Sequence, residues 1–362
     1  EGEYLNGKRN GKGKEYNNKG ELIYEGEYLK GKRCGKGREY NNKGELIYEG
    51  EYNNGKRNGK GKEYYSNGIL LFEGEYINGK KSYGKGFEYK NNKLIYEGEY
   101  KNGRRDGKGK EYNSEGELIY EGDYLYNWRR KGKEYNKGRL EYEGEYLYNK
   151  KWNGKVTEYN ERGQLIFEGD LIQKENKKIG KEYKDGKLVF EGEYINNKKW
   201  NGKGYGPENN IIYELKDGNG YIKEYSKFSK LIFEGEYKDG EINGKVKEYE
   251  LLKGKLKFEG EYKNGKRNGS GKEYNLFDKL IFEGEYKNGN RDGIGKEFNY
   301  KGDIIFDGEY LINKRWNGKR KEYNYQGKLL FEELYLNGFI INKIEYNVLK
   351  KKWNINKRKN EV

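Results

Sequence analysis

Histidine, methionine and alanine are absent from the 362-residue chain, and cysteine and proline each occur only once. A single cysteine, Cys34, forms no internal disulfide, and without histidine no catalytic His triad or Cys/His metal site can be built. No apolar run approaches the ~20 residues of a membrane-spanning helix. We therefore expect no metal, no cofactor and no enzymatic activity. The chain begins at Glu1 without a basic and apolar leader, and we expect it to be a fragment or a processed chain.

The composition predicts an ordered protein without one large core. Apolar residues make up 32 % and charged residues 38 % of the chain, and the net charge is 76 − 61 = +15. Globular domains have about 45–50 % apolar residues, and such low hydropathy would normally indicate disorder. The 40 Tyr, 13 Phe and 5 Trp oppose that interpretation. The sequence favours many small, local aromatic contacts.

An internal repeat determines the expected fold. Glu-Gly or Asp-Gly recurs 13 times, most often 24 residues apart, and degenerate copies at Glu214-Leu215 and Glu332-Glu333 complete fifteen units. Each unit carries a hairpin signal such as Asn6-Gly7 and a second turn such as residues 17–20. Alternating runs rich in Tyr and Ile lie between them and predict strands. The fold class is therefore all-β: an elongated, single-layer antiparallel β-meander, a solenoid-like rod of about 15 two-strand units.

The alternation also predicts two different faces. If residues 17–20 form a four-residue loop, Gly13 pairs with Tyr24, and each tyrosine ring lies over a glycine of the neighbouring strand. The opposite face then holds Glu and Lys in cross-strand pairs. The aromatic face comprises Gly11, Gly13, Leu22, Tyr24, Gly26 and Tyr28, and the charged face comprises Lys12, Lys14, Tyr16, Ile23, Glu25 and Glu27.

The repeat resembles a known family. Residues 48–61 read Tyr-Glu-Gly-Glu-Tyr-Asn-Asn-Gly-Lys-Arg-Asn-Gly-Lys-Gly, and related stretches cover nearly the whole chain. This pattern resembles the MORN (membrane occupation and recognition nexus) repeat, although Tyr stands where the family usually has Trp. The resemblance implies an elongated, twisted β-meander that acts as an interaction or tethering module, and some such arrays have been linked to anionic lipids. The connections also resemble MORN-variant repeats of bacterial and large-virus proteins.

The array is expected to be interrupted once. Residues 204–227 contain the only proline, Pro207, and lose the Glu-Gly motif. We therefore predict an N-terminal subarray at 1–203, a degenerate repeat and bend at 204–227, a C-terminal subarray at 228–333, and a cap with a basic tail at 334–362.

Several motifs that suggest chemistry have simpler explanations. Gly-Lys-Gly-Lys at residues 11–14 lacks the Ser/Thr and the helix of a phosphate-binding loop. Glu-Gly-Glu recurs too often to be a catalytic pair, and the calcium-loop pattern that starts at Asp217 ends in Phe228 where Glu is needed.

Two surfaces are candidate partner sites, and each also has a purely structural interpretation. The aromatic face is either packing alone or an open groove for a protein partner or for self-association. Aromatic residues in lengthened turns either guard an edge or form an interaction hot spot. The candidate residues are Tyr24, Tyr28, Tyr48, Tyr52, Phe72, Tyr76, Trp128, Trp152, Trp200 and Trp316. The tail is either part of the cap or a membrane contact formed by Lys350, Lys351, Lys352, Trp353, Lys357, Arg358 and Lys359.

The first functional hypothesis is a non-catalytic scaffold or tether for protein–protein interaction. Spread evenly, the charge of +15 gives about one net positive per ~10 Å, which is close to the Debye length, so weak, salt-sensitive contact with anionic membranes is the alternative. An antitoxin-like inhibitor is a third candidate, by analogy alone. Specific nucleic-acid binding is not expected, because aromatic and basic residues fall on opposite faces. We expect a cytoplasmic location, or a peripheral position at a membrane.

Overall fold

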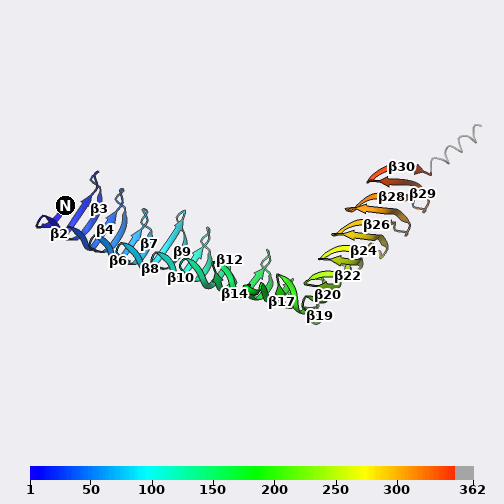
Figure 1. Cartoon of the computed structure of the whole chain (residues 1–362), viewed down its shortest axis with the longest axis horizontal. Helices are drawn as coiled ribbons and strands as arrows, with labels where there is room; N and C mark the ends of the chain where they lie inside the picture. Colours follow the sequence, from blue (N-terminus) through cyan, green and yellow to red (C-terminus); the bar gives the residue numbers. More distant parts are fainter. Residues whose placement is uncertain (347–362) are drawn as a thin grey trace, which may run out of the picture. The chain divides into compact units, whose positions relative to one another are not determined.

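Nearly every segment of residues 1–346, which the computed structural model describes, is a β-strand or a turn between strands (Figure 1). The strands form a single-layer antiparallel sheet in which consecutive strands are neighbours, which confirms the predicted all-β meander of about 15 two-strand units. The only helical turn in the described part is η1 (Gln173–Glu175). The chain divides into unit 1 (Glu1–Glu158 and Gly169–Glu175) and unit 2 (Tyr159–Glu168 and Asn176 onward).

Unit 1 contains fourteen consecutive strands, except that the last residue of the fourteenth belongs to unit 2. They are β1 (Gly2–Leu5), β2 (Lys8–Tyr16), β3 (Leu22–Leu29), β4 (Lys32–Tyr40), β5 (Leu46–Asn53), β6 (Lys56–Tyr64), β7 (Leu70–Ile77), β8 (Lys80–Lys90), β9 (Lys93–Lys101), β10 (Arg104–Tyr112), β11 (Leu118–Leu125), β12 (Trp128–Asn136), β13 (Arg139–Leu147) and β14 (Lys150–Tyr159). Strand β15 (Leu165–Ile172) is divided between the two units.

Unit 2 continues the same alternation to the end of the described residues. Its strands are β16 (Lys177–Lys184), β17 (Lys187–Ile195), β18 (Lys198–Tyr205), β19 (Ile211–Lys216), β20 (Asn219–Tyr225), β21 (Leu231–Lys238), β22 (Glu241–Tyr249), β23 (Leu256–Lys263), β24 (Lys266–Tyr274), β25 (Leu280–Lys287), β26 (Asn290–Phe298), β27 (Ile304–Leu311), β28 (Lys314–Tyr323), β29 (Leu329–Leu336) and β30 (Phe339–Glu345). Strand pairing continues through 204–227 by way of the short strands β19 and β20. The predicted subarray boundaries stay predictions.

The Asn-Gly signals form two-residue turns, as predicted. Leu5 pairs with Lys8, and Asn6 and Gly7 between them have φ values of 48° and 71°. Two consecutive positive φ angles define the type I′ turn that suits the twist of a hairpin. The N–H of Gly31 in the next turn donates to the carbonyl of Arg9 at 2.8 Å, and the later turns repeat this contact. The short turns are therefore fixed in a row along one edge of each unit.

The second connection is one residue longer than predicted. Residues 17–21 lie between paired Tyr16 and Leu22. The side-chain oxygen of Asn17 accepts the backbone N–H groups of Lys19 and Glu21 at 2.9 and 3.0 Å, so it replaces backbone partners inside the loop. This longer loop and an irregularity between Glu15 and Tyr16 change the strand register.

The expected pairing of Gly13 with Tyr24 is wrong. Gly13 pairs with Gly26, and Glu15 pairs with Tyr24. The first hairpin is shifted as well, because the three residues Asn10–Lys12 bulge opposite Glu3 and Gly2 pairs with Gly13. Gly11 in this bulge has φ +106°, a conformation that L side chains rarely adopt. Both shifts move the pairing by two residues, so the division into two faces survives.

The predicted packing of rings over glycines is confirmed. A Cβ atom added to Gly37 would come within 2.3 Å of the hydroxyl of Tyr24, and one added to Gly61 equally close to that of Tyr48. Neighbouring rings meet edge to face, as between Tyr24 and Tyr52, whose centroids are 5.3 Å apart. Only glycine leaves room for these rings.

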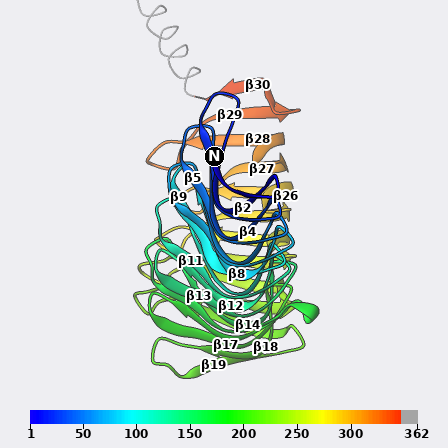
Figure 2. The same cartoon turned by 90° about the vertical axis from the view of Figure 1, so that its left-hand side faces the viewer.

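Of the two interpretations of the aromatic face, packing alone agrees with the burial of its rings, and an open groove does not. The cluster of Tyr24, Tyr28, Tyr48, Tyr52, Phe72 and Tyr76 is 0–4 % exposed, and unit 2 has an equivalent cluster around Phe258, Phe282 and Phe306. The strands are curved rather than straight (Figure 2), and the rings of both clusters are buried. The rings pack edge to face against one another and against glycines of the same sheet, so one layer of sheet encloses its own core.

Candidate interaction surfaces

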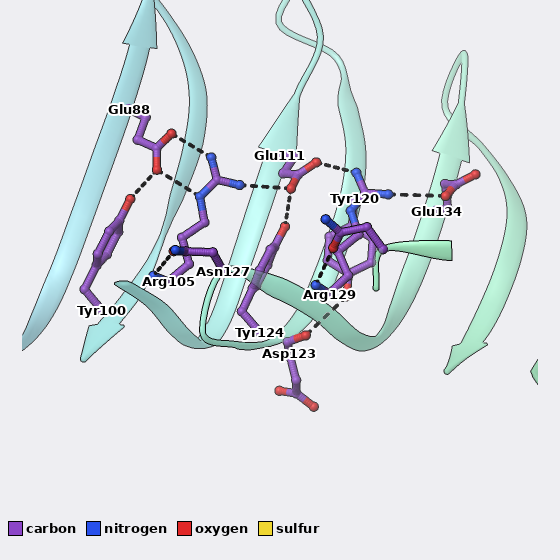
Figure 3. Close-up of polar contacts among 11 residues, drawn as sticks. Glu88, Tyr100, Arg105, Glu111, Tyr120, Asp123, Tyr124, Asn127, Arg129 and Glu134 are labelled. Atoms are coloured by element: carbon purple, nitrogen blue, oxygen red, sulfur yellow. Dashed lines mark hydrogen bonds and ion pairs between the residues drawn. The ribbon is translucent and has the colours of Figure 1, made fainter. Parts of the chain in front are cut away.

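A row of alternating arginine and glutamate side chains lies over the buried rings on the aromatic face (Figure 3). Arg105 donates to both carboxylate oxygens of Glu88, at 2.8 and 2.6 Å, and to Glu111 at 3.1 Å. Glu111 also accepts hydrogen bonds from Arg129 and, at 2.7 Å, from the hydroxyl of Tyr124. Each arginine thus links the carboxylates of two successive repeats. The sequence pattern predicted charged residues on the other face, and this row was not predicted.

The same arginines cover the aromatic rings. The guanidinium of Arg105 lies 3.9 Å from the ring centroid of Tyr96, and Arg33 lies 4.0 Å from that of Tyr24. A cation over a ring face is attracted by the ring quadrupole. The layers of glycine, ring and arginine therefore explain how a single sheet buries tyrosine completely.

Hydrogen bonds within the row keep the Glu111 carboxylate ionised. Burial raises the pKa of the Glu111 carboxyl, but hydrogen bonds from Arg129 and Tyr124 outweigh burial and hold this pKa below its ordinary value of 4.5. Burial raises the pKa of Tyr48 to about 12, so its hydroxyl stays neutral at physiological pH. A general acid or base needs a pKa near the working pH, and these groups are shifted away from it. Among residues 1–346 no cluster of His, Cys, Asp or Glu could hold a metal ion.

The opposite face, which we call the ladder face, carries a furrow floored by the paired glycines. In unit 1 it has a volume of about 1070 Å³ and runs from Glu1 on the N-terminal side to Gly84 on β8. Further stretches of about 550 Å³ (β8 to β13, unit 1) and about 840 Å³ (β20 to β26, unit 2) have the same kind of lining. Asp123 in Figure 3 points to this face, away from the arginine row. The furrow is thus a hollowed surface that the sequence pattern did not predict.

The walls of the furrow are two rows of charged side chains. One row pairs internally: Arg38 lies 3.7 Å from Glu25 and 3.5 Å from Glu49, and Lys62 lies 3.3 Å from Glu73. These pairs confirm the predicted cross-strand contacts between acidic and basic residues.

The positive charge of unit 1 is concentrated on one edge. We define its turn edge as the seven short turns with their flanking strand residues: 5–8, 29–32, 53–56, 77–80, 101–104, 125–128 and 147–150. All 28 residues are exposed. They include eight cations and no acid: Lys8, Lys30, Lys32, Lys56, Lys80, Lys101, Arg104 and Lys150. Along the chain these cations recur once or twice in most repeats, but between the two edges of unit 1 the charge is uneven.

The loop edge on the other side of unit 1 differs. With the flanking strand residues, its loops at 16–22, 40–46, 64–70, 90–93, 112–118 and 136–139 contain six cations and four acids, a net charge of 6 − 4 = +2. The turn edge has a net charge of +8. This asymmetry is readable in the sequence once the turns are located, because each Asn-Gly turn is followed by Lys or Arg in the first five units.

Exposed apolar side chains alternate with the cations on the turn edge. They are Leu5 (60 %), Leu29 (56 %), Ile77 (56 %), Tyr126 (58 %), Trp128 (48 %) and Tyr148 (70 %), together with Leu125 and Leu147. Trp128 meets Tyr148 edge to face with centroids 5.8 Å apart. Of the four predicted edge tryptophans only Trp128 is exposed, whereas Trp152, Trp200 and Trp316 are half-buried. Trp200 and Trp316 lie against the turn glycines Gly218 and Gly338. The basic residues predicted for membrane contact, Lys350 to Lys352 and Lys357 to Lys359 with Trp353, lie outside the described residues.

Within residues 1–346 no helix is long and apolar enough to cross a membrane. No curated protein matches the chain at a significant level. Solved structures that match include the crystal structure of TcdB2-TccC3-TEV and that of TcdB2-TccC3-Cdc42, both at 10 % identity and a TM-score of 0.22. These matches cover 93 % and 89 % of this chain, which spans about a fifth of the length of either structure.

The profile of the MORN repeat matches seven stretches in both units. They are residues 1–21, 24–45, 48–69, 96–117, 233–245, 258–274 and 282–304. The matched stretches hold the same Glu-Gly strand motifs, paired glycines and buried rings that build the sheet. The chain therefore carries MORN repeats in both of its units.

Proposed function

We propose that the protein is a non-catalytic scaffold whose turn edge in unit 1 rests on an anionic membrane surface. MORN repeats are consistent with a repeat scaffold that binds proteins or membranes. The observation that carries the membrane proposal is the turn edge itself, with eight exposed cations, no acid and a row of exposed apolar tips.

Charge supplies the attraction to the surface. A Lys or Arg close to an anionic membrane contributes about 1 kcal/mol. Lys8, Lys32, Lys56 and Lys80 follow successive turns that are tied together by backbone hydrogen bonds such as Gly55 to Arg33 and Gly79 to Arg57. The cations are therefore held in one row before binding, and little conformational entropy is lost when they meet the surface.

The apolar tips favour a lipid surface over a nucleic acid. Leu5, Leu29 and Ile77 project beside the lysines and offer aliphatic groups that can enter the headgroup region, where burial of apolar area adds to electrostatic attraction. Tyr126 and Trp128 are residue types enriched at membrane interfaces. A protein that binds the phosphates of a nucleic acid gains no affinity from exposed aliphatic side chains.

Vesicle sedimentation tests this proposal with the full chain. We expect binding to vesicles of phosphatidylcholine with about one third phosphatidylserine, and release as salt rises from about 0.05 M to about 0.3 M. The variant with Lys8, Lys32, Lys56 and Lys80 changed to Ser should lose about tenfold or more in affinity.

The matched control removes the same charge from the loop edge by changing Lys19, Lys43, Lys90 and Lys137 to Ser. This variant should keep most of its affinity. Equal losses in both variants would mean that only the total charge matters. If the protein does not bind these vesicles at low salt, the membrane proposal is refuted, and a protein partner becomes the candidate ligand of the turn edge.

A further inference from the structure

The furrow of unit 1 contains cations that the repeat itself does not use. Lys12, Lys36 and Lys60 each precede the central glycine of their strand, line the furrow and are exposed. None of the three forms an ion pair with a carboxylate among residues 1–346. In the next repeat the same position is Tyr83, whose ring is 54 % exposed.

Four of the nearby carboxylates are engaged by other groups, while Glu75, which pairs across the strands with Lys60, also lines the furrow. Glu27 and Glu51 accept the backbone N–H groups of Lys36 and Lys60 at 3.4 and 3.3 Å and fold over the bulge glycines. Glu25 and Glu49 face Arg38 in the other wall. The ammonium groups are thus left available to a ligand.

The spacing of these cations points to a class of ligand. Equivalent residues of successive repeats are two strands apart, or about 9.6 Å. A polyproline II helix has three residues per turn and advances about 9.3 Å in that turn. We propose that the furrow of unit 1 binds an extended polyproline II segment with an acidic side chain at every third position. One acidic residue then meets each of Lys12, Lys36 and Lys60.

The shape of the furrow agrees with such a ligand. Its floor is glycine backbone, so a chain can approach closely, and a polyproline II segment presents only one of its three rows of side chains to that floor. Tyr83 at the end of the row supplies an aromatic surface of the kind that grooves for proline-rich segments use.

The furrow is not a general anion site. Its lining contains six cations and seven acids, a formal net charge of 6 − 7 = −1. Recognition must therefore depend on where the ligand's charges lie. The site is also confined to unit 1, because Ser270 and Ile294 stand at two of the equivalent positions along the unit 2 furrow.

Two fluorescent peptides of identical composition test the proposal by anisotropy with the full chain. One contains four Pro-Pro-Glu triplets, and the other has its four glutamates contiguous between proline runs. We expect the triplet peptide to bind about tenfold more tightly or better. Equal affinity of the two peptides, or no binding of either, would overturn the proposal.

Matched variants locate the site. In the first variant Lys12, Lys36 and Lys60 are changed to Ser, which is the residue at the equivalent position 270. This variant should bind the triplet peptide about tenfold more weakly and should bind vesicles as before. In the second variant Lys8, Lys32 and Lys56 are changed to Ser. This variant should bind vesicles more weakly and keep its affinity for the triplet peptide, so the furrow proposal and the membrane proposal can fail separately. The single variant Lys36→Ser, with circular dichroism to confirm folding, should still weaken the peptide about threefold. A furrow variant that binds the peptide normally would refute the site.

Discussion

Gly37 lies directly against the ring of Tyr24, so that an added Cβ atom would come within 2.3 Å of the hydroxyl oxygen and 2.7 Å of a ring carbon. Gly37 has no positive φ, so its role is to leave space and not to permit an unusual backbone. The buried ring meets this glycine on one side and Arg33 on the other.

Substitution of Gly37 by Ala should therefore destabilise the array by overpacking, by about 1–3 kcal/mol. The damage should stay near β3 to β5, because repeat units contact only their neighbours. Hydrogen exchange of backbone amides measures this, with Gly7→Ala as a control that strains a turn without any contact within 4 Å. Uniform loss of protection along unit 1 would contradict neighbour-limited coupling.

Removing the hydroxyl of Tyr24 should stabilise the protein. This oxygen is buried and has no hydrogen-bond partner, and Phe occupies the equivalent place at Phe72 and Phe258. We expect Tyr24→Phe to gain about 1 kcal/mol. Tyr28→Phe is the control with the opposite expected effect, because the hydroxyl of Tyr28 donates a hydrogen bond to Glu15 at 2.7 Å. This variant should lose about 1 kcal/mol of unfolding free energy. Thermal melting of both variants is the measurement, and a loss of stability in Tyr24→Phe would show that the hydroxyl has a partner in solution.

Acid should destabilise the arginine row. The pKa values of Glu39, Glu111 and Glu273 are held below 4.5, because hydrogen bonds from arginine outweigh the opposite effect of burial. For a group with a lowered folded-state pKa, the unfolded chain binds more protons, so stability is full above the unfolded value and is lost as pH falls through the folded one. The melting temperature should therefore be constant above about pH 5 and fall below about pH 4.5. If the melting temperature already begins to fall near neutral pH, groups other than these carboxylates control the stability in acid.

The ladder face should contribute little to stability. Lys62 and Glu73 form a pair at 3.3 Å with side chains that are 45 % and 53 % exposed, and exposed pairs of this kind contribute about 0–1 kcal/mol. Changing both residues to Ser should shift urea unfolding by less than about 1 kcal/mol. A similar double change of Glu39 and Arg57, which are 18 % and 21 % exposed, should cost clearly more.

The sequence predicted the turns and the two faces because both follow from short-range rules. Asn6-Gly7 specifies its turn by itself, and a period of two assigns Tyr24 and Glu25 to opposite faces whatever the register. The register itself was missed, since Gly11 and Gly13 look alike in the sequence although one forms a bulge with positive φ and the other supports a ring.

The sequence analysis also missed the bend of the strands. Alternation along a strand indicates which residues share a face but not whether the strand bends, so it left open whether the rings of Tyr24 and Tyr48 form a groove or a core. Arg33 and Glu39 could have been assigned to the ring face by parity, but only the folded arms show that they cover it.

The arginine row has a consequence for how such a chain can change in evolution. Arg33 binds Glu15 behind it and Glu39 in its own repeat, and Arg57 repeats this with Glu39 and Glu63. A duplication of a full 24-residue period restores every link, since the inserted repeat brings one arginine and one glutamate in phase. Arg33 and Glu39 both lie on β4, and the ring-bearing strand β3 separates them from Glu15 on β2. A duplication of half a period would place two strands of the same kind side by side and break this alternation. Gain or loss of whole periods is thus the tolerated change, and the number of repeats can vary while each remaining repeat keeps its partners.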